Sequence, residues 1–136
     1  MHVRMLRTLL SVFVIILLGA AVLGCGDSET VGPAGEPEYA GAATETTLQG
    51  LSEKNLEKYT RYGNPEFKAA VTQEILDKAA DQIGGQLGAY VSKEFLYAEE
   101  KDGYTIVHYK ANYAKGEAGI RMVFDKDHLV AGQWFE

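Results

Sequence analysis

Four polar side chains in the C-terminal half of the chain are of types that could carry out acid–base chemistry. They are Glu94, Tyr109, Tyr113 and Gln133. A carboxyl group beside phenols in a dry pocket can transfer protons, because burial raises its pKa toward neutrality. Alternatively, the tyrosines pack in the core and hydrogen-bond Gln133. We prefer the second interpretation, because the sequence shows no paired acid and base.

Two further groups carry charges or metal-binding atoms. His108, Lys110 and Arg121 could bind an anion together, or they form a solvated face that nearby carboxylates neutralise. Residues 125–128 contain two aspartates and a histidine, which we interpret as a polar turn, because no second cluster of metal ligands is visible. The sequence has no Gly-rich phosphate loop, nucleophile elbow or Cys–His pair. It therefore assigns no catalytic, cofactor-binding or metal-binding residue.

The charge of the chain limits its partners. The 136 residues carry a formal net charge of −6, and an acidic domain repels a phosphate backbone, so we expect no nucleic-acid binding. Acidity also gives no attraction to anionic lipid. A membrane association would therefore need an anchor.

The N-terminal residues provide a candidate anchor. Arg4 and Arg7 precede an apolar run over residues 9–23, and Cys25, the only cysteine, follows it. A basic start, a short apolar stretch and small residues are typical of an export signal. Val22-Leu23-Gly24-Cys25 resembles a prokaryotic lipobox, which implies cleavage after residues 1–24, a lipid on Cys25 and a location on the extracytoplasmic side of the cell membrane. An uncleaved signal anchor is the alternative.

Residues 25–46 are rich in Gly, Ala, Glu, Thr and Pro, with few large apolar side chains. Such a composition buries too little surface to offset its ordering entropy, which predicts a flexible tether. The globular domain is then expected over residues 47–136.

The first part of this domain has helical periodicity. Apolar positions predict one helix over residues 48–62 that ends at Gly63. Asn64 and Pro65 are typical of a helix start, and Thr72 can cap a third helix. That helix has an apolar stripe containing Ile75, Ala79 and Ile83, and the Gly84–Gly85 pair could end it early.

After Gly88 the period changes to two, which predicts strands over residues 89–99, 104–114, 117–125 and 128–135. Short turns at residues 102–103, 115–116 and 126–127 imply an antiparallel meander. With these turns, Tyr109 lies opposite Met122, and Phe124 lies opposite both Val107 and Leu129. Five residues then share one face and are expected to pack against the stripe of the third helix: Val107, Tyr109, Ile120, Met122 and Phe124.

The opposite face combines rings and charges, which are typical of interfaces. It is expected to hold Phe95, Tyr97, His108, Lys110, Arg121, Val123, Val130 and Trp134. His108, Arg121 and Trp134 are its candidate contact residues, and the partner would be a second copy of the domain or another envelope protein.

Residues 104–117, YTIVHYKANYAKGE, and 124–135, FDKDHLVAGQWF, resemble the domain of unknown function family 3887, over residues 51–135 in all. The resemblance implies an α+β fold, with N-terminal helices packed on a four-stranded antiparallel meander sheet, as in the nuclear transport factor 2-like (cystatin-like) roll. The resemblance also implies a domain of the kind often found ahead of α/β-hydrolase domains or in lipoproteins. Its motifs are structural and name no function.

Two functions remain open at this point. The first is a membrane-anchored lipoprotein with a non-enzymatic binding or assembly domain. The second is a small-molecule-binding protein, or an enzyme of the isomerase or dehydratase type, that uses a cavity in the roll. A pocket and its lining would distinguish them.

Overall fold

The computed structural model describes residues 35–136. The expected signal peptide, Cys25 and most of the expected tether lie outside these residues. The described elements run in the order α1 Glu38–Ser52, α2 Leu56–Thr60, α3 Pro65–Ala70, α4 Gln73–Leu87, β1 Tyr90–Lys101, β2 Tyr104–Tyr113, β3 Gly116–Phe124 and β4 Val130–Phe135. None of the helices in residues 35–136 has the length and apolar character needed to cross a bilayer.

Helix α1 corrects the predicted domain boundary. Residues 38–46 were expected to belong to a flexible tether, but they form the first half of this helix. The helix is amphipathic with mostly small side chains, and its buried positions repeat at three and four residues: Ala40, Ala43, Thr44, Thr47, Leu48 and Leu51. Small residues give little hydropathy signal, yet they let a helix backbone lie close to its neighbours.

The predicted helix over residues 48–62 is divided in two. Lys54 has a positive φ of 57°, which ends α1, and the Asn55 side chain then accepts a hydrogen bond from the Lys58 N–H and caps α2. Helix α2 folds back onto α1 at Gly50, where a Cβ would collide with the backbone of Tyr59. The close approach explains why glycine occupies this position.

The starts of α3 and α4 are confirmed. The Asn64 side chain accepts from the Phe67 N–H with Pro65 at the first turn, and the Thr72 hydroxyl accepts from the Ile75 N–H. Helix α4 continues through the glycine pair to Leu87 and ends at Gly88, whose φ of 79° suits glycine alone among ordinary residues.

The sheet has the predicted antiparallel order β1-β2-β3-β4, and the turn at residues 102–103 is confirmed by the pairing of Lys101 with Tyr104. The next turn is Ala114–Lys115, not Lys115–Gly116, because Tyr113 pairs with Gly116. The β2–β3 register therefore differs by two residues from the prediction. An even shift keeps every side chain on its predicted face, and Val107, Tyr109, Ile120, Met122 and Phe124 are all fully buried.

Two of the three register irregularities in the edge strands move residues from the predicted outer face to the core side. Phe95 pairs with Tyr109 and Tyr97 with His108, so Leu96 is an extra residue in β1. Phe95 therefore lies on the core side, contrary to the prediction, whereas Tyr97 keeps its outer position. An irregularity in β4 pairs Val130 with Phe124. Val130 is consequently buried, although it was expected on the outer face.

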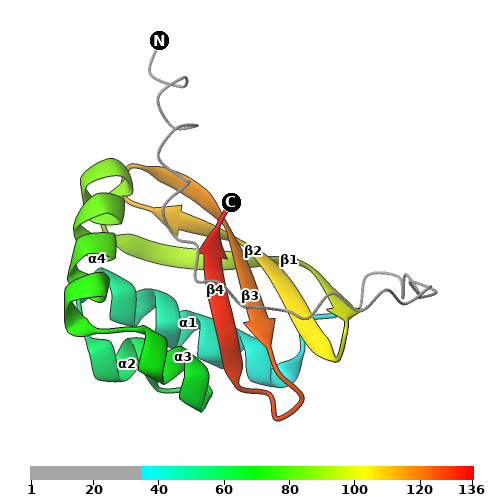
Figure 1. Cartoon of the computed structure of the whole chain (residues 1–136). Coiled ribbons are helices and arrows are strands. Elements are labelled where there is room, and N and C mark those ends of the chain that lie inside the picture. The colour runs from blue at the N-terminus through cyan, green and yellow to red at the C-terminus, as the bar shows by residue number, and fades with distance from the viewer. Residues whose placement is uncertain (1–34) are drawn as a thin grey trace.

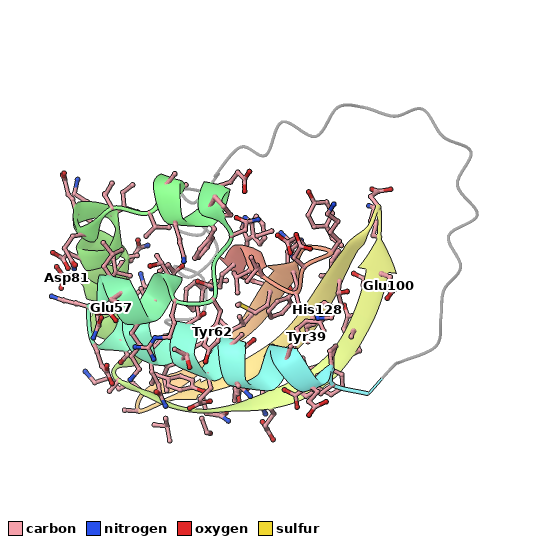
Figure 2. All side chains as sticks on the ribbon, turned by 90° about the horizontal axis from the view of Figure 1, so that it is seen from below. Tyr39, Glu57, Tyr62, Asp81, Glu100 and His128 are labelled. Carbon is pink, nitrogen blue, oxygen red and sulfur yellow. The ribbon has the colours of Figure 1, made fainter. Side chains whose placement is uncertain are left out.

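The helices cover the concave face of a curved sheet, as Figures 1 and 2 show. Helix α1 contacts β1, α2 and α4, and α3 contacts β4. The Tyr109 hydroxyl donates to Glu36 at 2.9 Å, which ties the segment before α1 to β2. The Tyr39 ring of α1 meets the edge of Phe124 and stacks on His128 (Figure 2). Thus α1 occupies the position that was predicted for α4.

Candidate functional site

The four residues of the expected acid–base pocket lie apart. Glu94 projects from the outer face, because the bulge at Leu96 pairs it with Lys110 instead of Ala111. The Lys110 ammonium lies 2.8 Å from the Glu94 carboxylate, and this hydrogen bond lowers the pKa of Glu94 below its ordinary value. An exposed, ionised carboxylate of this kind is the opposite of a desolvated acid.

The tyrosines are part of the core. Tyr109 is fully buried, and its ring meets the edge of Phe95 at 6.0 Å. Burial raises the pKa of the Tyr109 hydroxyl, and the hydrogen bond to Glu36 raises it further. Tyr113 packs edge-on against Tyr90, and burial raises the pKa of Tyr113 to about 12. Both side chains are therefore packed, neutral phenols.

Gln133 is the one member of the expected set that lines the cleft beside α4 and the β3–β4 side of the sheet. Its Oε1 accepts a hydrogen bond from the Tyr59 hydroxyl at 3.0 Å. Its Nε2 is buried without a hydrogen-bond partner. The Tyr59 hydroxyl is itself buried, and burial raises its pKa well above the ordinary value, so it stays a donor at neutral pH. The Gln133 amide is thereby held with its nitrogen turned away from Tyr59.

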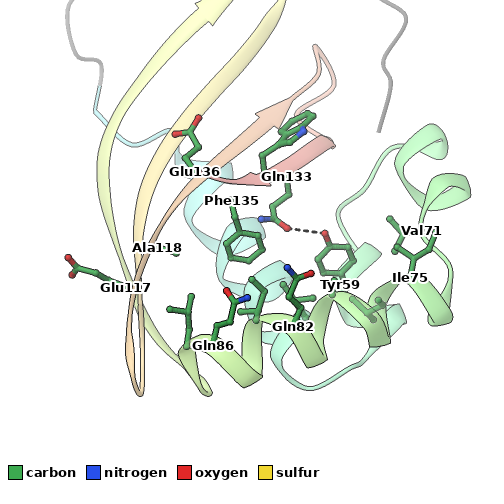
Figure 3. A pocket seen from close by; sticks show the side chains of 16 residues that line it. Tyr59, Val71, Ile75, Gln82, Gln86, Glu117, Ala118, Gln133, Phe135 and Glu136 are labelled. Atoms are coloured by element: carbon green, nitrogen blue, oxygen red, sulfur yellow. Dashed lines mark hydrogen bonds between the residues drawn. The ribbon is translucent and has the colours of Figure 1, made fainter. Parts of the chain in front are cut away.

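The cleft lies between α4 and the β3–β4 side of the sheet (Figure 3). Its volume is about 140 Å³. Most of its wall is apolar, and the lining includes Leu51, Val71, Ile75, Leu76, Ala79, Ile83, Leu87, Ala118 and Phe135. Three amides also line it, Gln82 and Gln86 from α4 and Gln133 from β4, as Figure 3 shows. Glu117 and Glu136 add carboxylates to the lining.

The cleft exists because the stripe of α4 does not close onto the sheet. Ile75, Ala79 and Ile83 were expected to pack directly on the buried strand residues. Ala79 and Ile83 are only partly buried beside the core, and Ile75 is 36% exposed. Since α1 already covers the concave face, α4 packs against α1 and leaves part of its apolar stripe open.

A second hollow, of about 310 Å³, lies beside the C-terminal half of α4. It is lined by Leu51, Lys54, Ala80, Gly85 and Tyr113, among others. Tyr113 is thus the second member of the predicted set that lies beside a cavity. The Tyr113 hydroxyl has no hydrogen-bond partner, and the lining also contains Lys54 and Asp81, which form an ion pair with each other.

The outer face of the sheet contains the predicted His108, Arg121 and Trp134 side by side. His108 is buried under the Tyr97 ring, which stacks on it at 4.1 Å. The Arg121 guanidinium lies 4.9 Å from the Trp134 ring centre, a cation–π distance. The register places Arg121 between His108 and Trp134, so the three residues are neighbours across β2, β3 and β4.

The charges of this cluster are already paired, which argues against an anion site. The two His108 ring nitrogens lie 3.3 Å from Glu99 and 3.5 Å from Glu136. Arg121 lies 3.6 Å from Glu136, and Lys110 contacts Glu94 and Glu117. Each predicted cation therefore faces at least one carboxylate.

The hairpin between β3 and β4 is a longer loop than the predicted two-residue turn. Asp125 Oδ1 accepts from the N–H groups of Asp127 and Leu129, and its Oδ2 accepts from Asn64. His128 has a φ of 62° and stacks on Tyr39. The Asp125 carboxylate thus organises the loop, and residues 35–136 contain no group of three metal-ligand side chains.

Sequence reasoning missed Tyr59, Gln82 and Gln86 as site residues. Gln82 and Gln86 are four residues apart on α4, beside Ile83, so a helical projection could have placed them next to the apolar stripe. Tyr59 lies within the predicted helix over residues 48–62, but its hydrogen-bond partner Gln133 is 74 residues away. Only the tertiary fold brings those two together.

The arrangement defines a class of small α+β domain in which helices cover one face of an antiparallel meander and a side cleft remains open. The chain belongs to the family described as "Protein of unknown function (DUF3887)", whose match spans residues 44–132. The match begins within α1, in agreement with the corrected domain boundary. No curated protein matches the chain significantly.

Proposed function

We propose that this protein is a lipid-anchored extracytoplasmic binding protein whose domain holds a small apolar molecule in the cleft beside α4. The domain is a nuclear transport factor 2-like roll in this proposal. The observation that supports it best is the cleft itself, an apolar space of about 140 Å³ with a buried amide nitrogen at its wall. A cavity of about 150 Å³ is large enough to hold a ring such as benzene.

Binding without chemical conversion is favoured over catalysis by the positions of the ionisable groups. The only ionisable side chains that line the cleft in residues 35–136 are Tyr59, Glu117 and Glu136. Tyr59 is a buried phenol with a raised pKa. Glu117 and Glu136 are each within 4 Å of cations of the outer face. These groups do not form an acid–base pair across the cleft.

Xenon enters apolar cavities and forms no hydrogen bonds, so it tests whether the cleft can hold an apolar molecule. Isoleucine methyl groups are suitable NMR probes, because Ile75 and Ile83 line the cleft and Ile106 does not. Xenon pressure should shift the Ile75 and Ile83 methyl signals and leave that of Ile106 in place. The variant Ala79→Phe, which fills the cleft, should abolish the shifts. Equal responses of all three methyl groups would refute the binding function.

The anchor is tested separately. The proposal requires a mature chain that starts at Cys25 with a diacylglyceryl group, since two acyl chains hold a protein stably where one does not. Mass spectrometry of the purified protein should show this terminus, and Cys25→Ser should release the protein from the detergent phase. An intact Met1 with an unmodified Cys25 would eliminate the lipoprotein proposal.

A second candidate function is assembly through the outer sheet face. Leu96 and Tyr97 are exposed large side chains on β1, and Tyr97 adjoins the cluster of Arg121 and Trp134. Aromatic residues and arginine are enriched at interfaces. Sedimentation across a concentration series should then show self-association that Trp134→Ala weakens, and a strict monomer would exclude the homodimer.

A further inference from the structure

Strand β1 exposes two apolar side chains that the sheet could have turned inward. Within residues 35–136 the most exposed large apolar side chains are Val91, at 64%, and Leu96, at 53%. Each is the extra residue at a point where the register of β1 against β2 shifts. A bulge re-aims a side chain and is usually a designed feature of a strand. Both irregularities of β1 therefore present an apolar side chain to the surroundings.

The same irregularities make β1 a poor edge for another strand. Strand β1 lies at one end of the sheet, beside β2 alone (Figure 1). Its 12 residues are interrupted at Val91 and Leu96, and bulges are one of the ways in which edge strands avoid pairing with another chain. A lipid surface, in contrast, covers apolar side chains without needing a regular ladder of backbone hydrogen bonds.

The chain enters the domain beside β1. Glu36 accepts a hydrogen bond from the Tyr109 hydroxyl at 2.9 Å and lies 3.6 Å from the Lys93 ammonium. Lys93 is on β1, between Val91 and Leu96. At about 3.3 Å per strand residue, both exposed side chains are within about 10 Å of this point along the strand. The segment that leads to the proposed anchor therefore meets the domain at the edge that carries them.

The proposed anchor makes a weak contact sufficient. About ten residues separate Cys25 from Gly35, and they span at most about 36 Å, which is comparable to the width of a domain of this size. Docking of the tethered domain on the bilayer is an intramolecular step with an effective concentration on the order of millimolar. Burial of one leucine side chain favours such a step by about tenfold or more.

The composition of β1 sets the depth of the contact and the kind of lipid. The strand carries lysines and glutamates in similar numbers, so it gains nothing from anionic head groups. Free backbone groups of an edge strand cannot enter the hydrocarbon region, so only the side chains of Val91 and Leu96 reach the acyl chains. Tyr97 is exposed next to Leu96, and tyrosine is enriched at the level of the head groups.

We infer that β1 rests on the surface of the bilayer that holds the lipid anchor, with Val91 and Leu96 inserted between zwitterionic lipids. The inference rests on the lipid anchor of the proposed function and adds an orientation to it. Strand β4 lies at the opposite end of the sheet from β1, and the cleft beside α4 is on the β3–β4 side. The cleft is thus held on the side away from the membrane.

The test uses the full lipidated chain in phosphatidylcholine nanodiscs, with methyl labels on isoleucine, leucine and valine. Phosphatidylcholine that carries a nitroxide near its head group enhances the relaxation of methyl groups close to the bilayer. We expect a several-fold larger enhancement at Val91 and Leu96 than at Ile75, which is also exposed but lies on α4. Equal enhancement at all three residues, or none at Val91 and Leu96, would overturn the inference.

Two variants assign the contact to Leu96. Leu96→Asp places a charge where lipid is expected and should abolish the enhancement at Val91, while the protein stays on the nanodisc through Cys25. Tyr62→Asp is the matched control, because it also replaces an exposed ring or apolar side chain by a carboxylate, but next to Val130 of β4. The control should keep the enhancement at Val91. Full enhancement at Val91 in the Leu96→Asp variant would refute the role of Leu96.

The outcomes separate the docking from the anchor. Cofractionation with nanodiscs reports the anchor, and methyl relaxation reports the docking. If the chain cofractionates but Val91 and Leu96 relax like Ile75, the anchor holds and the docking is wrong. If the chain does not cofractionate, the anchor is wrong and the docking is overturned with it. If the two signals respond to the number of chains per nanodisc and not to the nitroxide, a second copy covers β1 and the bilayer assignment is wrong. The wild-type comparison decides the inference even if Leu96→Asp fails to fold.

Discussion

Replacing Tyr113 with phenylalanine should make the protein more resistant to alkali. Burial raises the pKa of Tyr113 to about 12 in the folded protein, whereas an unfolded tyrosine has a pKa of about 10. Between these values the unfolded chain loses the phenolic proton and the folded chain keeps it. The stabilising contribution is therefore complete below pH 10 and is lost as the pH rises through 12.

The size of the effect follows from the two pKa values. At pH 11 the hydroxyl of Tyr113 should lower the free energy of unfolding by about 1.4 kcal/mol relative to its value at pH 8. The Tyr113→Phe variant lacks this loss. At pH 8 the variant should be as stable as wild type or more stable by up to about 1 kcal/mol, because the buried hydroxyl has no hydrogen-bond partner.

The assay is urea unfolding of residues 35–136, followed by circular dichroism at pH 8 and pH 11. The free energies of unfolding of variant and wild type are subtracted at each pH. Only the change in this difference between pH 8 and pH 11 is interpreted, because the other titrating groups are present in both proteins and cancel. Tyr97→Phe serves as the matched control, because it also removes one phenolic hydroxyl, but from a side chain that is 42% exposed. A Tyr113→Phe difference that is equal at both pH values would refute the burial of this phenol.

Three further substitutions test the packing. Phe124→Ala should lower the free energy of unfolding by about 3–5 kcal/mol in urea titrations, because the ring is fully buried beside Tyr39. Glu36→Ala removes the acceptor of the Tyr109 hydroxyl and should cost about 1–3 kcal/mol in the same assay. Gly132→Ala places a Cβ against the ring of Trp134, the only tryptophan, and should change its fluorescence emission; an unchanged spectrum would contradict the placement of the ring.

The strands and their two faces could be predicted from the alternation of apolar and polar residues in β2 and β3. This alternation assigns the same faces even when the position of the turn between the strands is wrong by one residue. The turn was misplaced by one residue at each end, which shifted the pairing by two and left Tyr109, Met122 and Phe124 on the correct face. Alternation thus predicts faces more reliably than it predicts partners.

The β1 strand shows what alternation cannot reveal. One extra residue, Leu96, exchanges the faces of Glu94 and Phe95, and this single bulge removed the carboxylate from the expected pocket. A bulge depends on how the strand bends over the helices. Its position is therefore a property of the tertiary packing, and the alternating pattern on each side of Leu96 is the same with or without it.

Helix α1 links the misplaced domain boundary to the unexpected cleft. Its buried face consists largely of alanine and threonine, a composition that resembles a tether when only large apolar residues are counted. Because these side chains are small, α1 can lie close enough to the sheet for Glu36 to reach Tyr109 and for Tyr39 to reach Phe124.

Because α1 already covers part of the concave face of the sheet, α4 has no complete apolar surface of the sheet to pack against. Helix α4 has the regular stripe expected of a core helix, yet Ile75 remains 36% exposed. Closing this stripe onto β3 and β4 would bury more apolar surface, but the Gln133 amide and its hydrogen bond to Tyr59 occupy the intervening wall. A leucine at position 133 would lower the free-energy cost of packing α4 onto β3 and β4, because no buried N–H would remain unpaired. The Gln133 amide and its hydrogen bond to Tyr59 therefore contribute to keeping the apolar stripe of α4 apart from β3 and β4.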